Sequence, residues 1–175
     1  MSFKENLNPR GFLPFSLAIF VIALDQGIKS FIAGNWPPNT HIADVFGNDI
    51  LWIIHVRNKV IAFSLGHSLP ETVRQVLFII MPALVLIFLV WYYFKTDELS
   101  PLQRWAIAGI TGGGIGNLID RVFRPEGVVD FISVKFYGLF GFERWPTFNI
   151  ADSSVVVCVF IFLFSMIFQK EKRHG

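Results

Sequence analysis

The chain has 175 residues, of which 53% are hydrophobic and only 16% are charged, and its mean hydropathy is +0.54. An average soluble domain carries about 25% charged residues, so this composition excludes an ordinary soluble protein and indicates a membrane protein. A net charge of +2, without a basic patch interleaved with aromatic residues, also argues against a nucleic-acid partner.

Four apolar segments are long enough to cross a bilayer as helices, since a span needs about 20 apolar residues. They cover residues 13–33, 76–94, 105–123 and 150–169. These four segments leave only short loops between them, and no linker or repeat divides the chain. We therefore expect one integral membrane domain over residues 1–175.

The first segment contains two charged residues, Asp25 and Lys29. We expect a retained helix rather than a cleaved secretory signal, because these charges interrupt the apolar run and no small-residue cleavage pattern follows. The two residues are four apart, so they share one helix face and can form an ion pair within it. This pairing explains both residues structurally, and a role in orienting a site is compatible with it.

A loop at residues 36–69 follows the first segment. Residues 51–56 and 60–65 are rich in β-branched and aromatic residues and flank a polar turn. This pattern predicts a small β-hairpin, and its partly apolar faces indicate that it lies on the membrane surface.

Four spans place both termini on the same side of the membrane. The dense cationic tail at residues 170–173 favours a cytoplasmic side for them. The acids Asp120, Asp130 and Asp152 then lie near the extracytoplasmic surface. Ionisable residues at the margins of membrane spans are candidates for function.

The third segment ends in a polar group formed by Asn117, Asp120 and Arg121. Asn117 and Asp120 are three residues apart and share a helix face. Arg121 is suited to pairing with the adjacent carboxylate, and equally to binding a phosphate or carbonyl group of a lipid. The spacing leaves both roles open. The nearby glycines Gly112 and Gly116 have the small-xxx-small spacing of closely packed membrane helices.

The acids Asp130 and Asp152 have contrasting surroundings. Asn149 and Asp152 fit a capping arrangement at the start of the last segment, which accounts for both residues without catalysis. A helix N-terminus favours negative charge, so we expect Asp152 to be ionised. Valine, phenylalanine and isoleucine flank Asp130, and burial there favours the neutral acid. One ionised and one protonated carboxylate are the starting state of an aspartyl protease.

Three sequence blocks, in this order, resemble the lipoprotein signal peptidases, which are the bacterial type II signal peptidases. The blocks are Gly-Asn-x-x-Asp-Arg at 116–121, Val-Val-Asp-Phe at 128–131 and Phe-Asn-x-Ala-Asp at 148–152. The resemblance covers nearly the whole chain. It implies an all-α membrane protein of the bacterial cytoplasmic (inner) membrane, with four transmembrane helices and a small extracytoplasmic β-hairpin or sheet lying on the membrane.

The resemblance also implies roles for individual residues. Asp130 and Asp152 match the catalytic pair of the family. The positions that match substrate-binding or supporting residues are Asn58, Asn117, Asp120, Arg121, Asn149, Asp25 and Lys29. The chain departs from the family at Val60, where a glycine is usual. Because a β-branched residue resists positive φ, the backbone after Asn58 is expected to differ.

The implied activity is that of an aspartyl endopeptidase without a cofactor or metal. It would remove signal peptides from diacylglyceryl-modified prolipoproteins by cutting before the lipidated cysteine. The implied partners are these precursors and membrane phospholipid, and the expected form is a monomer. An all-oxygen metal site built from four acids is a lesser alternative.

Two other functions compete with this interpretation. The first is a small transporter or proton conductor that uses its intramembrane acids as a relay. The inner portions of all four segments contain no Asp, Glu, Lys, Arg or His, which argues against a path across the bilayer. The second is a structural subunit whose polar residues only pack, which would explain the caps but not Asp130.

Overall fold

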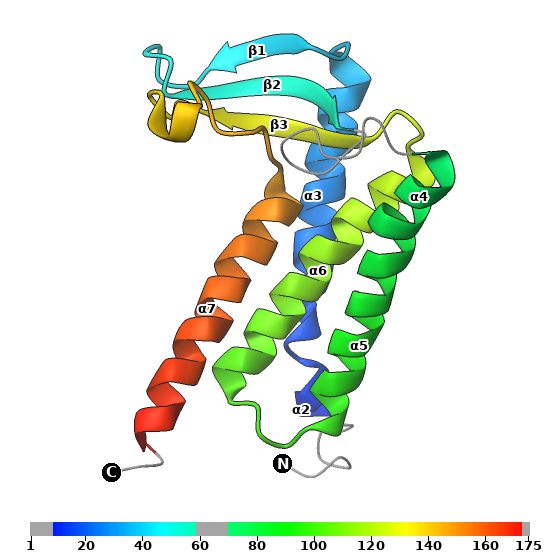
Figure 1. The fold of residues 1–175 in the computed structure, drawn as a ribbon, viewed down its shortest axis with the longest axis vertical. Coiled ribbons are helices and arrows are strands. Elements are labelled where there is room, and N and C mark those ends of the chain that lie inside the picture. The colour runs from blue at the N-terminus through cyan, green and yellow to red at the C-terminus, as the bar shows by residue number, and fades with distance from the viewer. Residues whose placement is uncertain (1–8, 59–69, 173–175) are drawn as a thin grey trace.

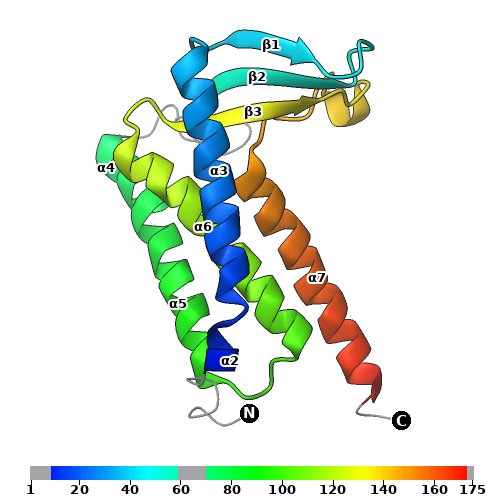
Figure 2. The same cartoon turned by 180° about the vertical axis from the view of Figure 1, so that it is seen from behind.

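The computed structural model describes residues 9–58 and 70–172 of the chain. Long helices run together in one bundle, and a small sheet lies across one end of it (Figures 1 and 2). In chain order, the elements are α2 (Pro9–Phe12), α3 (Phe15–Asn35), β1 (Thr40–Asp44), β2 (Leu51–Asn58), α4 (Glu71–Gln75), η2 (Val76–Ile80), α5 (Met81–Lys95), α6 (Pro101–Phe123), β3 (Val128–Val134), η3 (Leu139–Gly141) and α7 (Ile150–Lys172).

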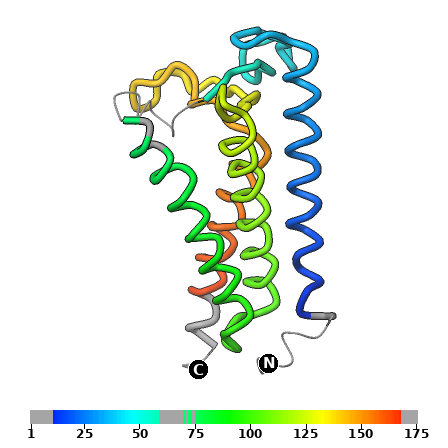
Figure 3. The backbone as a smooth tube through the Cα atoms, turned by 90° about the vertical axis from the view of Figure 1, so that its right-hand side faces the viewer, coloured from blue at the N-terminus to red at the C-terminus, as the bar shows by residue number. Residues whose placement is uncertain are grey.

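Three helices within the described residues are long and apolar enough to cross a membrane. They are Phe15–Asn35, Val76–Lys95 and Ile150–Ile167, and they coincide closely with three of the four predicted spans. The other predicted span, residues 105–123, forms most of α6. This helix contacts α3, α5 and α7, and it lies between α3 and α5 in Figure 3. The sequence of α6 is less apolar than those of the helices around it. Many of its side chains are buried against protein, where polar groups can find partners.

The glycines of α6 allow its neighbours to approach closely. A Cβ atom at Gly112 would lie 2.7 Å from the Cα atom of Ala18 in α3, and one at Gly113 would meet the carbonyl oxygen of Ala151 in α7. Real Cβ contacts are longer than this, so a side chain at either position would push a helix away. A Cβ atom at Gly116 would lie 2.9 Å from Asp25 Oδ2 and 3.2 Å from the Cβ atom of Ala151, so the predicted packing role of Gly112 and Gly116 is confirmed.

The sheet has three antiparallel strands in the order β1-β2-β3. The predicted hairpin was wrong about the partners of residues 51–56, because β2 pairs with β1 on one edge and with β3 on the other. The proposed second arm, residues 60–65, lies outside the described residues. Residues 128–131 were predicted only as a sequence block, but residues 128–134 form the strand β3. Asp130 and Ser133 interrupt its apolar residues without producing a strict alternation.

The side chains of β3 alternate between two faces, as in any strand. Val129 and Phe131 are buried and form a hydrophobic core cluster with Ile32 of α3. Asp130 lies between them in the sequence and therefore points to the other face of the strand. Packing of β3 against α3 thus determines the direction of the Asp130 carboxylate.

Candidate active site

Asp130 and Asp152 line the same cavity, although they come from different elements. Asp130 is on β3 and Asp152 is in the first turn of α7, directly where that helix meets the sheet (Figure 1). The cavity has a volume of about 600 Å³. Its polar lining includes Asn58, Asn117, Arg121, Asp130 and Asp152, and its apolar wall includes Val128, Trp145, Phe148, Val156 and Val157.

The Asp130 carboxylate is almost completely buried and accepts two amide hydrogen bonds. Asn149 Nδ2 donates to its Oδ1 atom at 2.7 Å, and Asn58 Nδ2 donates to its Oδ2 atom at 2.9 Å. Burial raises the pKa of Asp130 to about 7, and repulsion from Asp152 acts in the same direction, while the two amides and Lys29 oppose the shift. The apolar flanks of Asp130 predicted this direction.

Asp152 forms the capping arrangement that the sequence predicted. Its backbone N–H donates to Asn149 Oδ1 at 3.0 Å, and the backbone N–H of Asn149 donates to Asp152 Oδ2 at 3.2 Å. Its other oxygen, Oδ1, accepts from Asn117 Nδ2 at 2.7 Å. The cap therefore orients one carboxylate oxygen and a neighbouring helix orients the other.

A buried ion network is joined to Asp152 through Asn117. Lys29 Nζ is 2.7 Å from Asp25 Oδ2 and 3.0 Å from Asp120 Oδ2, and all three side chains are fully buried. Lys29 Nζ also donates to Asn117 Oδ1 at 3.0 Å. The predicted pair of Asp25 and Lys29 is confirmed, and it extends across to α6.

The two arginines near Asp120 have different positions. Arg124 Nη1 is 2.6 Å from Asp120 Oδ1, whereas Arg121 lines the cavity with Asp130 and Asp152. Arg121 was the predicted partner of Asp120, and Arg124 was not predicted. The signal was available, because Arg124 follows Asp120 by four residues, which is the spacing of an ion pair on one helix face.

Gln26 is a further member of the network that was not predicted from the sequence. Its Nε2 atom donates to the carbonyl oxygen of Gly116 at 2.9 Å, to Asp120 Oδ1 at 3.0 Å and to Asp25 Oδ2 at 3.2 Å. The available signal was an uncharged polar residue inside a membrane-length apolar segment, where polar groups need partners.

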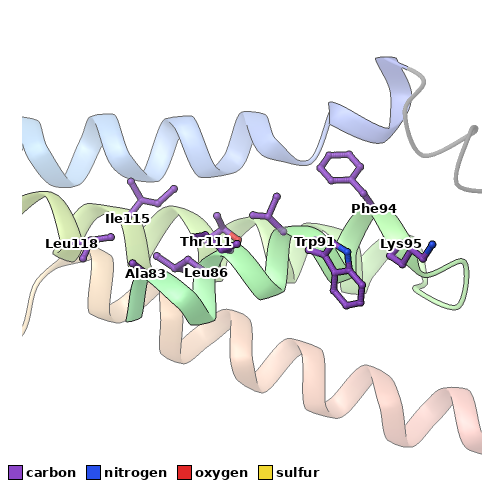
Figure 4. Close-up of a pocket in the computed structure, with 10 residues that line it drawn as sticks. Ala83, Leu86, Trp91, Phe94, Lys95, Thr111, Ile115 and Leu118 are labelled. Carbon is purple, nitrogen blue, oxygen red and sulfur yellow. The ribbon is translucent and has the colours of Figure 1, made fainter. Parts of the chain in front are cut away.

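A second hollow of about 810 Å³ lies between α5 and α6 (Figure 4). Its wall is almost entirely apolar, with Leu86, Trp91 and Ile115 among its residues, and Lys95 lies at one end. None of the residues proposed for the site from the sequence lines it. Among the described residues, its lining includes no carboxylate, whereas Asp130 and Asp152 both line the first cavity.

The structure also bears on metal binding. Across residues 9–58 and 70–172, no group of three or more His, Cys, Asp or Glu side chains is arranged to hold a metal ion. Asp25 and Asp120, which the sequence offered as metal ligands together with the other two acids, both pair with Lys29.

Comparisons with known proteins identify the family of the chain. The family described as signal peptidase (SPase) II matches residues 17–168. The chain is 47% identical over 160 residues to the lipoprotein signal peptidase of Treponema pallidum, covering 91% of this chain and 86% of that protein. It is 50% identical over 147 residues to the lipoprotein signal peptidase of Treponema denticola, covering 84% of each.

A solved structure, described as a bacterial membrane enzyme, superposes on this one with a TM-score of 0.76. The two are 29% identical, and the superposition covers 91% of this chain and 90% of that one. Because the family match spans most of the chain and the relatives are similar over nearly their whole length, the chain belongs to the signal peptidase II family.

Proposed function

We propose that Asp130 and Asp152 carry out peptide-bond hydrolysis in this membrane peptidase, which processes the signal peptides of lipoprotein precursors. The observation that carries the proposal is the meeting of two carboxylates from different elements in one cavity, each held by amide N–H donors. An aspartyl peptidase needs such a pair, with one carboxyl group acting as base and the other as acid.

In this mechanism, ionised Asp152 accepts a proton from a bound water as the water oxygen attacks the scissile carbonyl carbon. Protonated Asp130 donates its proton to the carbonyl oxygen, which forms a tetrahedral diol. Asp152 then passes its proton to the amide nitrogen as the C–N bond breaks, and Asp130 recovers a proton from the diol. The pKa of about 7 for Asp130 supports its role as the acid that is protonated at the start.

The charge balance around the cavity supports a shared proton. Four acids and three cations form the described cavity and network, namely Asp25, Asp120, Asp130, Asp152, Lys29, Arg121 and Arg124. Buried charges are stable only when they are paired. One retained proton makes this set neutral, and the pKa of Asp130, raised to about 7 by burial, is suited to holding it.

The cavity lining supports a lipidated substrate. Its valines and aromatic rings are suited to apolar chains, and Arg121 lines the same cavity as the two aspartates. A guanidinium group binds carbonyl and phosphate oxygens through a planar fork of donors. We assign to Arg121 the ester carbonyls or phosphate of lipid at the site, and we place the cut just before the cysteine that bears diacylglycerol.

The arrangement of the elements supports a four-span topology with α6 as the remaining span. The first described helix, α2, lies at one end of the bundle, and α7 ends there as well. The sheet lies at the opposite end (Figure 1). We place the termini in the cytoplasm and the sheet and cavity at the extracytoplasmic surface, with the sheet on the membrane. The single chain contains both aspartates, so a monomer suffices.

A cleavage assay tests the proposal. The protein in phospholipid nanodiscs is incubated with a precursor peptide whose cysteine carries diacylglycerol, and mass spectrometry identifies both products. We expect one cut on the N-terminal side of that cysteine, and no cut in an Asp130→Asn, Asp152→Asn double variant. Cleavage elsewhere, or by the double variant, would contradict the proposed site.

A further inference from the structure

The side-chain amide of Asn117 has only one orientation that satisfies its neighbours. Lys29 Nζ and Asn149 Nδ2 both lie against its Oδ1 atom, at 3.0 and 3.1 Å. An ammonium group and an amide NH₂ group can only donate, so the atom that faces them must be the acceptor. The Nδ2 atom of Asn117 must therefore face Asp152, to which it donates at 2.7 Å.

The orientation of the Asn149 side-chain amide is determined in the same way, by the donors and acceptors around it. Its Oδ1 atom accepts from the backbone N–H of Asp152, so its Nδ2 atom is the one that faces Asp130 and Asn117. Both asparagines thus point N–H groups at the aspartates. For Asn117, Lys29 contributes to this direction, because its ammonium group admits only acceptors around it.

Lys29 is in turn held by two carboxylates from different helices. Asp25 Oδ2 and Asp120 Oδ2 lie 2.7 and 3.0 Å from Nζ. Two negative charges that share one cation repel each other, so their geometry needs further support. Asp25 receives it from the backbone N–H of Ala151, and Asp120 receives it from Arg124 and from the backbone N–H of Val129.

Gln26 is a second side chain, besides Lys29, that contacts both acids. Its amide NH₂ group lies between Asp25 Oδ2 and Asp120 Oδ1, and it also contacts the carbonyl oxygen of Gly116. It therefore ties α3 to α6 at the level of the network. A neutral donor is required here, because a carboxylate would add a third negative charge and a cation would compete with Lys29.

We infer that Gln26 is a positioning residue for hydrolysis: by holding Asp25 and Asp120 around Lys29, it fixes the amide direction of Asn117 and thereby the carboxylate of Asp152. The inference rests on the proposed role of Asp152. Of the described residues that line the cavity, Asn117 is the one that Lys29 reaches by a hydrogen bond. The effect of Gln26 is therefore on turnover rather than on substrate binding.

The main test compares Gln26→Met with Gln103→Met in nanodiscs. Gln103 is a buried glutamine at the opposite end of α6, where its side chain accepts from the backbone N–H of Ser100 in a capping box. The control thus loses a structural hydrogen bond of similar kind without touching the network. The measurements are kcat, KM, melting temperature and the pH dependence of kcat on a lipidated precursor peptide.

For Gln26→Met we expect kcat to fall about 10- to 100-fold, because small displacements of a catalytic group have effects of this size. KM should change by less than about twofold, as for a group that acts only in the transition state. The acidic limb of the kcat profile should move to higher pH, because Asn117 then holds its N–H donor less firmly at Asp152 and stabilises the ionised carboxylate less. Gln103→Met should keep the wild-type profile even where its melting temperature falls.

Gln26→Glu gives an independent readout if the methionine variant does not fold. Below neutral pH its carboxyl group can take up a proton and regain one donor. Its activity relative to the wild type should therefore rise as pH falls, opposite to the trend in Gln26→Met.

Equal kcat per folded enzyme and an unmoved pH profile in Gln26→Met would overturn the inference, as would a ratio for Gln26→Glu that does not change with pH. The variant Asp152→Asn distinguishes a failure of the inference about Gln26 from a failure of the proposed catalytic pair. If Asp152→Asn is inactive and Gln26→Met is normal, only the inference about Gln26 fails. If Asp152→Asn cleaves normally, the proposed function of the pair fails.

Discussion

Asn149 holds Asp130 with its side chain, since its Nδ2 atom lies 2.7 Å from Asp130 Oδ1. The backbone N–H of the same residue donates to Asp152 at 3.2 Å. One residue thus determines how a carboxylate on the sheet is placed relative to a carboxylate on a helix. This relationship makes Asn149 part of both the helix cap and the site.

Replacing Asn149 separates these two roles. Serine caps a helix about as well as asparagine, whereas alanine costs about 1 kcal/mol. Neither can reach Asp130 with an amide, so we expect kcat to fall about 10- to 100-fold in both, as for a misplaced catalytic group. The melting temperature should be lower in Asn149→Ala than in Asn149→Ser. Near-normal turnover in the serine variant would show that Asp130 does not need this contact.

The single variants Asp130→Asn and Asp152→Asn test the catalytic pair. Each removes an acid or a base that the mechanism requires, so we expect turnover to fall by about 10³-fold or more. Both proteins should remain folded, since asparagine keeps the shape of the side chain. The matched control is Asp97→Asn, an exposed acid at the opposite end of the bundle from the cavity. Substantial turnover in either site variant would remove that residue from the mechanism.

The raised pKa of Asp130 predicts a pH dependence of stability. The native state binds this proton up to about pH 7, whereas an unfolded aspartate releases it near its ordinary value of 3.8. Between these values the native state holds more protons, so the free energy of unfolding falls as pH rises. We expect the melting temperature of the wild type in detergent to fall more steeply between pH 5 and 7 than that of Asp130→Asn. Parallel curves would exclude this titration.

The two arginines should affect different properties. Arg121 lines the cavity, so Arg121→Gln should raise KM for a lipidated peptide by about tenfold or more, the effect of losing a hydrogen bond to a charged group. The same variant should show a smaller ratio of its rate on lipidated peptide to its rate on unlipidated peptide. Arg124 pairs with Asp120, so Arg124→Gln should lower the melting temperature and keep that preference. Equal rates on both peptides in the wild type would contradict the lipid role.

The sequence by itself determined the features that depend on neighbours along the chain. Composition and length showed three of the membrane helices, because an apolar run of that length has few other stable environments. The ion pair of Asp25 and Lys29 and the cap of Asn149 and Asp152 followed from spacings of four and three residues within one helix. Such contacts form wherever the helix forms.

Only the tertiary structure decided which distant residues meet. Lys29 reaches Asn117 across 88 residues of sequence, Gln26 reaches Asp120 across 94, and Asn58 reaches Asp130 across 72. The strand β3 was not predicted, because its residues lack a strict alternation of polar and apolar side chains. Its pairing with β2 and its packing on α3 define it as a strand. The contacts of Lys29 and Gln26 depend on where α6 and its glycines bring the helices together, and that of Asn58 depends on the pairing of β2 with β3. No local period in the sequence encodes that position, so the direction of the amides at the two aspartates appeared only in the folded protein.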